Sequence, residues 1–325
     1  MTSQRALPPQ EAAPAGRHEH HRQILTRAAA LPPVPTAVVH PCQAASLEAA
    51  AEAARLRLIE PILVGPADKI AATAAASGLD ISRFRLVDAP HSHAAAAAAV
   101  ALVRAGEAAM LMKGALHTDE LMAEVVSTTQ GLRTAQRISH AYLMDVPGYP
   151  RPLILTDAAI NILPSLEDKR DIIQNAIDLA QVLGVAVPRV AILSAVETVT
   201  AKLPSTLDAA ALCKMAERGQ ITGGVLDGPL GFDNAVDPEA ARVKGLVSAV
   251  AGQADILVVP DLEAGNMLAK QLTFLARADA AGIVLGARVP IILTSRADSR
   301  CTLIASCALA VILADARQRR PPGIA

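Results

Sequence analysis

The sequence contains no tryptophan, only two tyrosines and only three phenylalanines, although hydrophobic residues make up 52% of its 325 residues. A core that lacks aromatic rings must be filled by alanine, valine, isoleucine and leucine. These residues are the usual filling of layered folds in which helices cover a parallel β-sheet. The composition therefore favours an α/β protein, and the length suits two domains better than one.

The chain also lacks an excess of charge of either sign, because its net charge is −1. Near neutrality gives no support to nucleic acid or an anionic membrane as a partner. Charges, glycines or prolines interrupt every apolar run before it reaches the length of a membrane helix. We therefore expect small molecules as partners, with no nucleic acid and no membrane.

Cysteine is scarce, since the chain has four of them and none forms a C-x-x-C pair. This spacing argues against a zinc site and against a disulfide framework, and it predicts a protein of the reducing cytoplasm. The first residues lack the basic start and apolar middle of a signal peptide. We expect residues 1–22 to form a disordered tail. Its run "HEHH", residues 18–21, can bind a metal, but we expect these side chains to be solvated instead.

Familiar nucleotide motifs are missing as well. No G-x-G-x-x-G follows the first expected strand, and no Walker A sequence occurs, so neither a Rossmann dinucleotide site nor a P-loop is supported. Asp227, Asp261 and Glu263 can bind a divalent cation, but they form no compact carboxylate pattern. We predict no metal site.

What the sequence does contain is a regular alternation of strand-like and helix-like segments. The segments that read as strands are 36–40, 61–65, 84–88, 109–114, 139–146, 152–157, 189–194, 223–228, 255–261, 281–286 and 289–295. Helical spacing of Ala and Leu occurs in 43–57, 91–105, 118–128, 167–183, 206–218 and 263–277, and a last helix is expected over about 299–315. This alternation predicts a largely parallel sheet covered by helices on both faces.

A break in the pattern marks the expected domain boundary. The run "DVPGYPRP", residues 145–152, has three prolines and one glycine, which stop both helix and strand. We predict a first α/β domain of residues 23–150 and 297–325, and a second α/β domain of residues 151–296. The last helix would then return to the first domain, leaving a cleft between the two.

Polar residues follow many of the expected strands at the point where each strand ends. In a parallel sheet such strand ends face the ligand, and helix N-termini there favour phosphate. Each residue can instead be an ordinary helix cap, and only the group as a whole favours a site. The residues that we predict to bind substrate are Lys113, His117, Thr118, Asp157, Asn161, Asp261, Glu263 and Asn266.

The run "VPIILTSRADSRCT", residues 289–302, concentrates such groups most strongly. It reads as a buried strand that ends by releasing Ser295, Arg296 and Asp298. An arginine binds phosphate with two parallel hydrogen bonds, and a carboxylate can accept a proton. We predict these three residues to be catalytic.

Several longer stretches resemble the phosphate acetyltransferase and phosphate butyryltransferase family. They include "LMKGALHTDELM", "PLILTDAAINILP", "AILSAVETV", "DILVVPDLEAGNMLAKQL" and "LTSRADS", and the likeness runs from about Arg27 to Val311. It is strongest to the phosphate acetyltransferase portion of enoyl-CoA hydratase fusions. The resemblance implies two three-layer α/β domains around a cleft, related to isocitrate and isopropylmalate dehydrogenases, in a homodimer. It also implies reversible transfer of an acyl group between coenzyme A and phosphate.

By the same resemblance, Ser295 and Arg296 match the catalytic Ser-Arg pair, and "GALHT" matches a phosphate-side loop that contains His117 and Thr118. Two positions depart from the family pattern. Thr302 stands where classical acetyltransferases have an aspartate base, so Asp298 is the nearest candidate base. Ala158 stands where they often have cysteine, so we expect direct attack in a ternary complex.

Alternatives remain open at this point. Acetyl is the expected acyl group, and butyryl is the alternative, because the "SRADS" run is closer to the butyryl branch. A dehydrogenase of the same fold and a non-catalytic acyl-CoA- or phosphate-binding protein are the rival classes. We expect no cofactor, since coenzyme A is a substrate.

Overall fold

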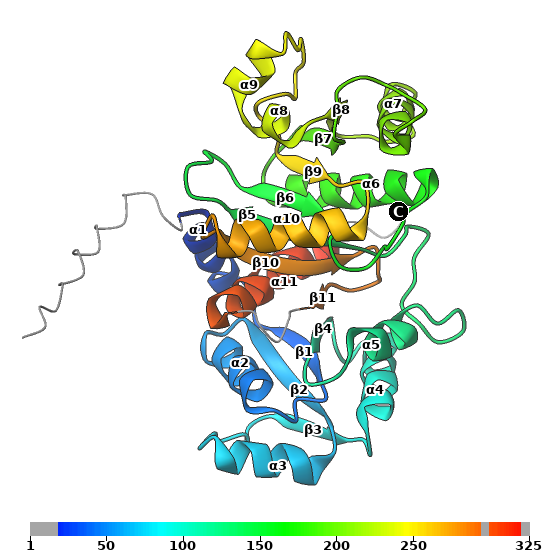
Figure 1. Cartoon of the computed structure of the whole chain (residues 1–325). Helices are drawn as coiled ribbons and strands as arrows, with labels where there is room; N and C mark the ends of the chain where they lie inside the picture. Colours follow the sequence, from blue (N-terminus) through cyan, green and yellow to red (C-terminus); the bar gives the residue numbers. More distant parts are fainter. Residues whose placement is uncertain (1–18, 294–298, 320–325) are drawn as a thin grey trace, which may run out of the picture.

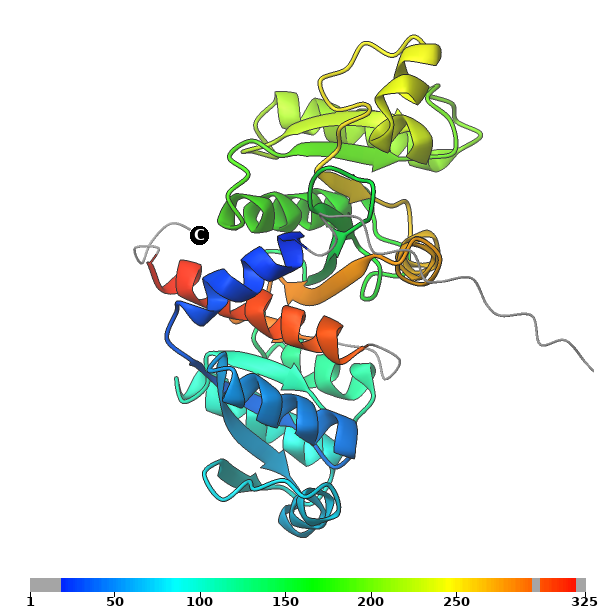
Figure 2. The same ribbon diagram turned by 90° about the vertical axis from the view of Figure 1, so that its left-hand side faces the viewer.

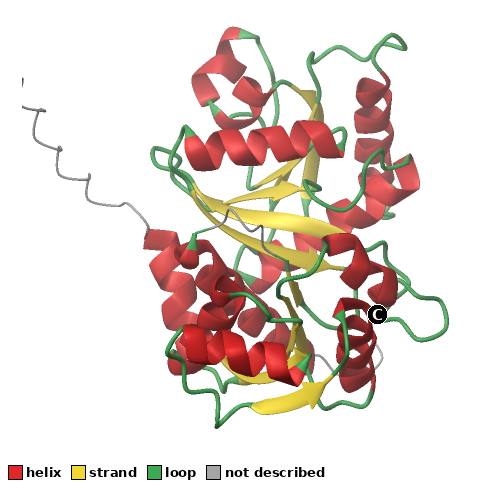
Figure 3. Cartoon of the chain, turned by 60° about the horizontal axis from the view of Figure 1, so that its bottom comes forward, coloured by secondary structure: helices red, strands yellow, loops and turns green. Residues whose placement is uncertain are grey.

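The computed structural model describes residues 19–293 and 299–319, which form one eleven-stranded mixed sheet with helices on both faces (Figures 1 and 3). The strands are β1 (Val34–Val39), β2 (Ile59–Gly65), β3 (Arg85–Asp88), β4 (Met110–Lys113), β5 (Ser139–Asp145), β6 (Leu153–Thr156), β7 (Arg189–Leu193), β8 (Val225–Leu230), β9 (Ile256–Val258), β10 (Asp279–Leu285) and β11 (Ile291–Ile292). Each of the eleven expected strand segments overlaps one of them, so the alternation of apolar runs predicted the strands correctly.

The helices also confirm the expected segments. They are α1 (Glu19–Ala29), α2 (Ala44–Arg55), α3 (Ala67–Ala76), α4 (Ser92–Arg104), α5 (Thr118–Val125), α6 (Leu166–Val182), α7 (Pro204–Glu217), α8 (Phe232–Val236), α9 (Pro238–Val243), α10 (Leu262–Phe274) and α11 (Arg300–Arg319). The last helix was expected to end near residue 315. It continues to Arg319, where Arg317 and Arg319 lie favourably in the last turn.

The strand order is β3-β2-β1-β4-β11-β10-β5-β6-β9-β7-β8. Strands β1–β4 and β11 are mutually parallel, and so are β6–β9. Between these blocks, β10 is antiparallel to β11 and to β5, and β5 is antiparallel to β6. The three reversals make β6–β9 run opposite to β1–β4. The expectation that all the polar strand ends share one edge is therefore wrong, because the two blocks end in opposite directions.

Alternation along the strands explains why both faces are covered. In β1, Val38 packs into one apolar cluster, whereas Ala37 and Val39 pack into another on the opposite face. In β6, Ile154 joins the first of these clusters, and Leu155 joins a third. A period of two residues places successive side chains on opposite faces, so both faces of the sheet are apolar and need helices over them.

Helix α11 crosses the middle of the molecule against β10, with α1 packed beside it (Figure 2). Its residues from Ile304 to Ala314 are buried. By length and composition alone this helix could cross a membrane, but 67% of its most apolar window is buried inside the molecule, as in a core helix. Its position links the two strand blocks across one face of the sheet. The predicted domain division remains a prediction.

Part of the segment that was expected to be a disordered tail is helical, because α1 begins at Glu19. Residues 19–22 were assigned to the tail, and His21 was expected to be solvated, yet His21 is only 8% exposed. The amphipathic stripe of Ile24, Leu25 and Ala28 packs against the main apolar cluster and draws these residues into the fold. The polar residues at the start of the helix made this apolar stripe difficult to recognise in the sequence.

Candidate active site

A pocket of about 600 Å³ lies where β7 and β9 end and where α7 and α10 begin. Its volume is within the usual range for small-molecule sites. Leu193, Leu268 and Phe232 give it apolar walls. Since β6, β9 and β7 are parallel neighbours, their polar ends meet at this edge of the sheet, as the sequence predicted for this block of strands.

A small polar cluster lies among those apolar walls. The Nζ atom of Lys169 donates to Oδ2 of Asp208 over 2.6 Å, and the hydroxyls of Ser194 and Ser205 are 2.9 Å apart. Lys169 is 5% exposed, whereas the side chain of Asp208 is 31% exposed, so the buried cation is paired with a carboxylate that still reaches water. A paired buried cation, two hydroxyls and an apolar wall suit a ligand that has both polar and apolar parts.

Asp261, Glu263 and Asn266 lie at the start of α10, and they take different roles. Asp261 lines the pocket, and its Oδ1 accepts the N–H of Ala264 over 2.9 Å, so it caps the helix. Glu263 is exposed, and Asn266 donates to the carbonyl of Ala158 over 3.3 Å. Asp261 therefore has both of the roles that the sequence left open, because it caps α10 and also lines the pocket.

Asp157 follows β6 and collects five hydrogen bonds with its carboxylate. Its Oδ1 accepts the N–H groups of Ala159 and Ile160 at 2.9 and 3.0 Å. Its Oδ2 accepts the N–H of His140 at 3.1 Å, and both the N–H and the side-chain amide of Asn161, at 3.3 and 2.6 Å. Asp157 and Asn161 are each 3% exposed. The carboxylate therefore organises the loop after β6, and its role in substrate binding remains a prediction.

Arg137 joins this network from the loop before β5. Its Nε donates to Oδ1 of Asn161 over 2.8 Å, and its Nη1 lies 3.2 Å from Oδ1 of Asp168 on α6. The side chain is 53% exposed, so a cation remains accessible beside the buried Asp157. Close approach of α10 completes the arrangement, because a Cβ on Gly265 would lie 2.7 Å from the carbonyl oxygen of Asp157.

Lys113, His117 and Thr118 lie at the other block of strands, after the end of β4. Lys113 is 9% exposed and ends β4, while Thr118 begins α5. His117 is the N-cap residue of α5 but makes no side-chain capping bond, and it is exposed. An exposed imidazole at an uncapped helix start is free to meet an anion. The fold separates these residues from the β6–β9 edge by strand direction.

Ser295, Arg296 and Asp298 lie outside the described residues, between Leu293 and Ser299. The start of α11 nevertheless bears on them. The Oγ of Ser299 accepts the N–H of Thr302 over 3.1 Å, and the two side-chain hydroxyls are 3.0 Å apart. Ser299 therefore caps α11, and that role no longer has to be assigned to Asp298.

Sequence reasoning missed Arg137, Lys169 and Asp208. Lys169 and Asp208 are 39 positions apart on two different helices, and neither lies in a strand-end motif. Arg137 lies in a polar stretch with no pattern of its own. No local signal in the sequence identifies such pairs, because only the packing of α6 against α7 brings them together.

Comparison with known proteins gives a consistent result. Residues 90–311 match a family model described as "Phosphate acetyl/butaryl transferase". A phosphate acetyltransferase of Rhizobium meliloti is 65% identical over 94% of this chain and 96% of its own length. A phosphate butyryltransferase of Clostridium acetobutylicum is 43% identical over 82% of this chain and 89% of its own.

Solved structures agree on the fold. A branched-chain phosphotransacylase from Enterococcus faecalis V583 matches with a TM-score of 0.76 and 29% identity, covering 86% of this chain and 99% of that one. A putative 4-hydroxythreonine-4-phosphate dehydrogenase from Salmonella typhimurium shares the fold alone, with a TM-score of 0.54 and 14% identity over 86% of this chain and 99% of its own. The expected dehydrogenase-like α/β fold is thus confirmed.

Proposed function

The chain belongs to the phosphate acetyl/butyryl transferase family, and we propose that it is a phosphate acetyltransferase. It would transfer an acetyl group reversibly between coenzyme A and inorganic phosphate. The observation that carries this proposal is the 65% identity to an acetyltransferase over 94% of the chain, against 43% to a butyryltransferase. Butyryl transfer is the second candidate, because the butyryl branch still matches most of the chain.

In this reaction, Arg296 would bind the phosphate, and Ser295 would stabilise the transition state. The attacked carbonyl oxygen gains negative charge, and a donor aimed at it lowers the barrier. The thiol of coenzyme A must lose a proton to attack, and a carboxylate within reach assists this step. We assign that role to Asp298, because Ser299 already caps α11 and Thr302 takes part in the same cap.

Direct attack by coenzyme A is favoured over an acyl-cysteine intermediate. Burial raises the pKa of all four thiols, and for Cys213 and Cys307 it raises the pKa to about 12. A thiol with so high a pKa is almost never a thiolate at neutral pH, and the thiolate is the nucleophile. The two substrates would therefore react side by side in a ternary complex.

Coenzyme A enters this account as a substrate, and no cofactor is proposed. The pocket at the ends of β7 and β9 has apolar walls and a polar cluster, which suit the pantetheine chain with its amide groups. Ser194, Ser205 and the Lys169–Asp208 pair would bind those amides. A spectrophotometric assay of thioester formation from acetyl phosphate and coenzyme A tests the proposed function, and a folded protein without turnover would favour a binding protein.

A homodimer and a cytoplasmic location complete the proposal. On α10 and just after it, Met267, Phe274 and Leu275 are 65%, 67% and 77% exposed. Leu275 also lines an apolar groove with Phe232 and Leu268. Such a face is more apolar than a solvated helix needs, and a second copy of the chain would bury it. Four free cysteines suit a reducing compartment. Light scattering at micromolar concentration would test the dimer.

A further inference from the structure

His40 follows β1 directly and has a backbone conformation that residues other than glycine rarely adopt. Its φ is 53°, in the left-handed region, although Pro41 after it would favour an extended conformation. Its side chain is partly buried. A strained residue of this kind persists only where surrounding contacts hold it, and such residues cluster at functional sites.

His40 binds both main-chain polar groups of Ala115, which lies in the loop that follows β4. Its carbonyl accepts the N–H of Ala115 over 2.9 Å, and its ring Nδ1 lies 3.0 Å from the carbonyl oxygen of Ala115. A carbonyl oxygen only accepts hydrogen bonds, so the hydrogen of this bond belongs to Nδ1 of the ring. His40 therefore fixes both the position of Ala115 and the direction of its peptide groups.

Gly114 shows how closely this loop approaches the end of β1. Its N–H donates to the carbonyl of Val39 over 2.9 Å, and its carbonyl accepts Nζ of Lys113 over 3.4 Å. A Cβ on Gly114 would lie 2.8 Å from the carbonyl oxygen of His40 and closer still to that of Val39. All four main-chain polar groups of Gly114 and Ala115 are thus engaged, and His40 supplies two of the bonds that hold the loop.

The loop leads to the start of α5, where the predicted substrate residues of this strand block lie. His117 is the N-cap residue, is exposed and makes no side-chain capping bond, so the first N–H groups of α5 lack the partner that a cap supplies. The carboxyl ends of β1, β4 and β11 lie at this same edge, because the three strands are parallel neighbours. Holding Ala115 therefore also places His117 and the start of a helix that favours phosphate.

We propose that His40 is a positioning residue for the phosphate side of the substrate site. Its Nδ1–H and its carbonyl hold Ala115, so that His117 and the start of α5 are in place before the phosphate binds. This inference rests on the proposed function, because it acts through the loop that the family resemblance places on the phosphate side. Gly114 belongs to the same device, since a side chain there would separate the loop from β1.

The kinetic test measures acetyl transfer from acetyl-CoA to inorganic phosphate, which gives KM for phosphate directly. His40→Gly keeps the left-handed backbone without strain but removes the ring, so KM for phosphate should rise roughly tenfold or more, with KM for acetyl-CoA within about twofold. His40→Asn also tolerates this backbone, and its amide nitrogen is as many bonds from Cα as Nδ1, so it should recover most of the loss. Arg57→Gly is the matched control, because Arg57 has a φ of 57° but precedes β2 at the opposite edge, and its KM values should not change.

A wild-type KM for phosphate in His40→Gly would overturn the proposal, and so would an equal rise in His40→Gly and His40→Asn, which would show that the bond from Nδ1 has no part in it. A second readout does not depend on activity: ¹⁵N NMR of labelled histidine in alkaline buffer should show His40 as the Nδ1–H tautomer, assigned by its loss in His40→Asn. An Nε2–H tautomer would contradict the inference even if the wild type proved inactive, whereas inactivity alone would contradict only the proposed function.

Discussion

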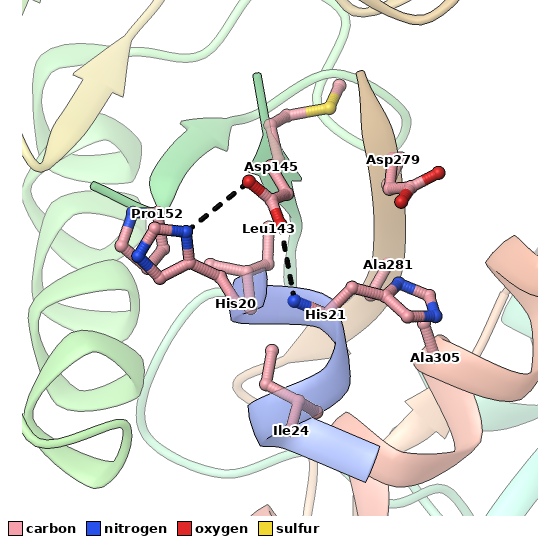
Figure 4. Close-up of a pocket in the computed structure, with 11 residues that line it drawn as sticks. His20, His21, Ile24, Leu143, Asp145, Pro152, Asp279, Ala281 and Ala305 are labelled. Atoms are coloured by element: carbon pink, nitrogen blue, oxygen red, sulfur yellow. Dashed lines mark hydrogen bonds and ion pairs between the residues drawn. The ribbon is translucent and has the colours of Figure 1, made fainter. Parts of the chain in front are cut away.

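The two ends of β5 carry ionisable side chains in opposite situations. At its end, Asp145 faces Asp279 across the β5–β10 ladder, and α1 covers it: the ring of His20 and the N–H of His21 both lie 3.3 Å from its carboxylate (Figure 4). At its start, the ring of His140 is buried, and neither of its nitrogens has a hydrogen-bond partner among the described residues. One strand thus has a polar end that is satisfied by the fold and a polar end that is not.

The two ends of β5 differ in how the fold compensates for a polar side chain that it buries. Two carboxylates opposite each other on a ladder repel, and the histidine-rich start of α1 offsets this, so the Asp145 end explains why α1 docks there. Nothing comparable among the described residues compensates for the ring of His140, although its main-chain N–H donates to Asp157. Changes at the His140 end should therefore alter how stability depends on pH, and changes at the Asp145 end should have only a small effect on stability.

The largest effect should come from Arg296, to which we assign the transferred phosphate. Arg296→Gln removes the charge that binds the transferred phosphate, and kcat should fall by roughly two orders of magnitude or more. Arg300→Gln is the control, because the side chain of Arg300 is 67% exposed and pairs with Glu52 over 3.1 Å. Steady-state kinetics of both purified proteins check this. Similar kcat values for the two variants would contradict the assignment of phosphate binding to Arg296.

Asp298→Asn should have the next largest effect. As the base for the thiol, its loss should lower kcat about a hundredfold at neutral pH, and less at high pH, where free thiolate forms. Ser299→Ala provides the comparison, because it removes the cap of α11 and should cost about 1 kcal/mol of stability with little change in kcat. A pH–rate profile of Asp298→Asn that matches the wild type would instead turn attention to Asp261 and Glu263.

His140 should also make the protein sensitive to acid. Its pKa in the fold is about 4, below the ordinary value of 6.5, so the unfolded chain binds the proton more readily. Stability from this group is complete above about pH 7 and is lost as the pH falls from about 6.5 to about 4; between pH 8 and pH 5 the loss is about 2 kcal/mol. Urea unfolding at both pH values should show a smaller loss in His140→Gln. An equal loss in both proteins would mean that the ring is not buried in the neutral form.

The smallest effect belongs to the Asp145 end. His20 and Asp145 have side chains that are 28% and 13% exposed, so His20→Ala should cost less than about 1 kcal/mol and leave kcat unchanged. Thermal unfolding and the acyl-transfer assay measure the two quantities. A large fall in kcat would show that α1 takes part in catalysis and would end the contrast between the two ends of β5.

The sequence predicted all eleven strands because each is a short apolar run, with polar or turn-forming residues at its ends. It did not predict that β6–β9 run opposite to β1–β4, since strand direction depends on long-range pairing through β5 and β10. It singled out Asp157 and Asp261 because they follow strands directly, and their part in substrate binding stays a prediction. It missed Lys169 and Asp208, whose partnership arises only when α6 packs against α7. His140 looked like an ordinary strand residue, and only its burial without a partner distinguishes it.

The most direct test of the central claim is the rate of thioester formation from coenzyme A with acetyl, propionyl and butyryl phosphates, measured side by side on the wild-type protein. The account predicts the highest kcat/KM with acetyl phosphate, with the rate falling as the acyl chain lengthens. A higher kcat/KM with butyryl phosphate would assign the chain to the butyryl branch. No thioester from any of the three, with a folded protein, would contradict the proposed acyl transfer itself.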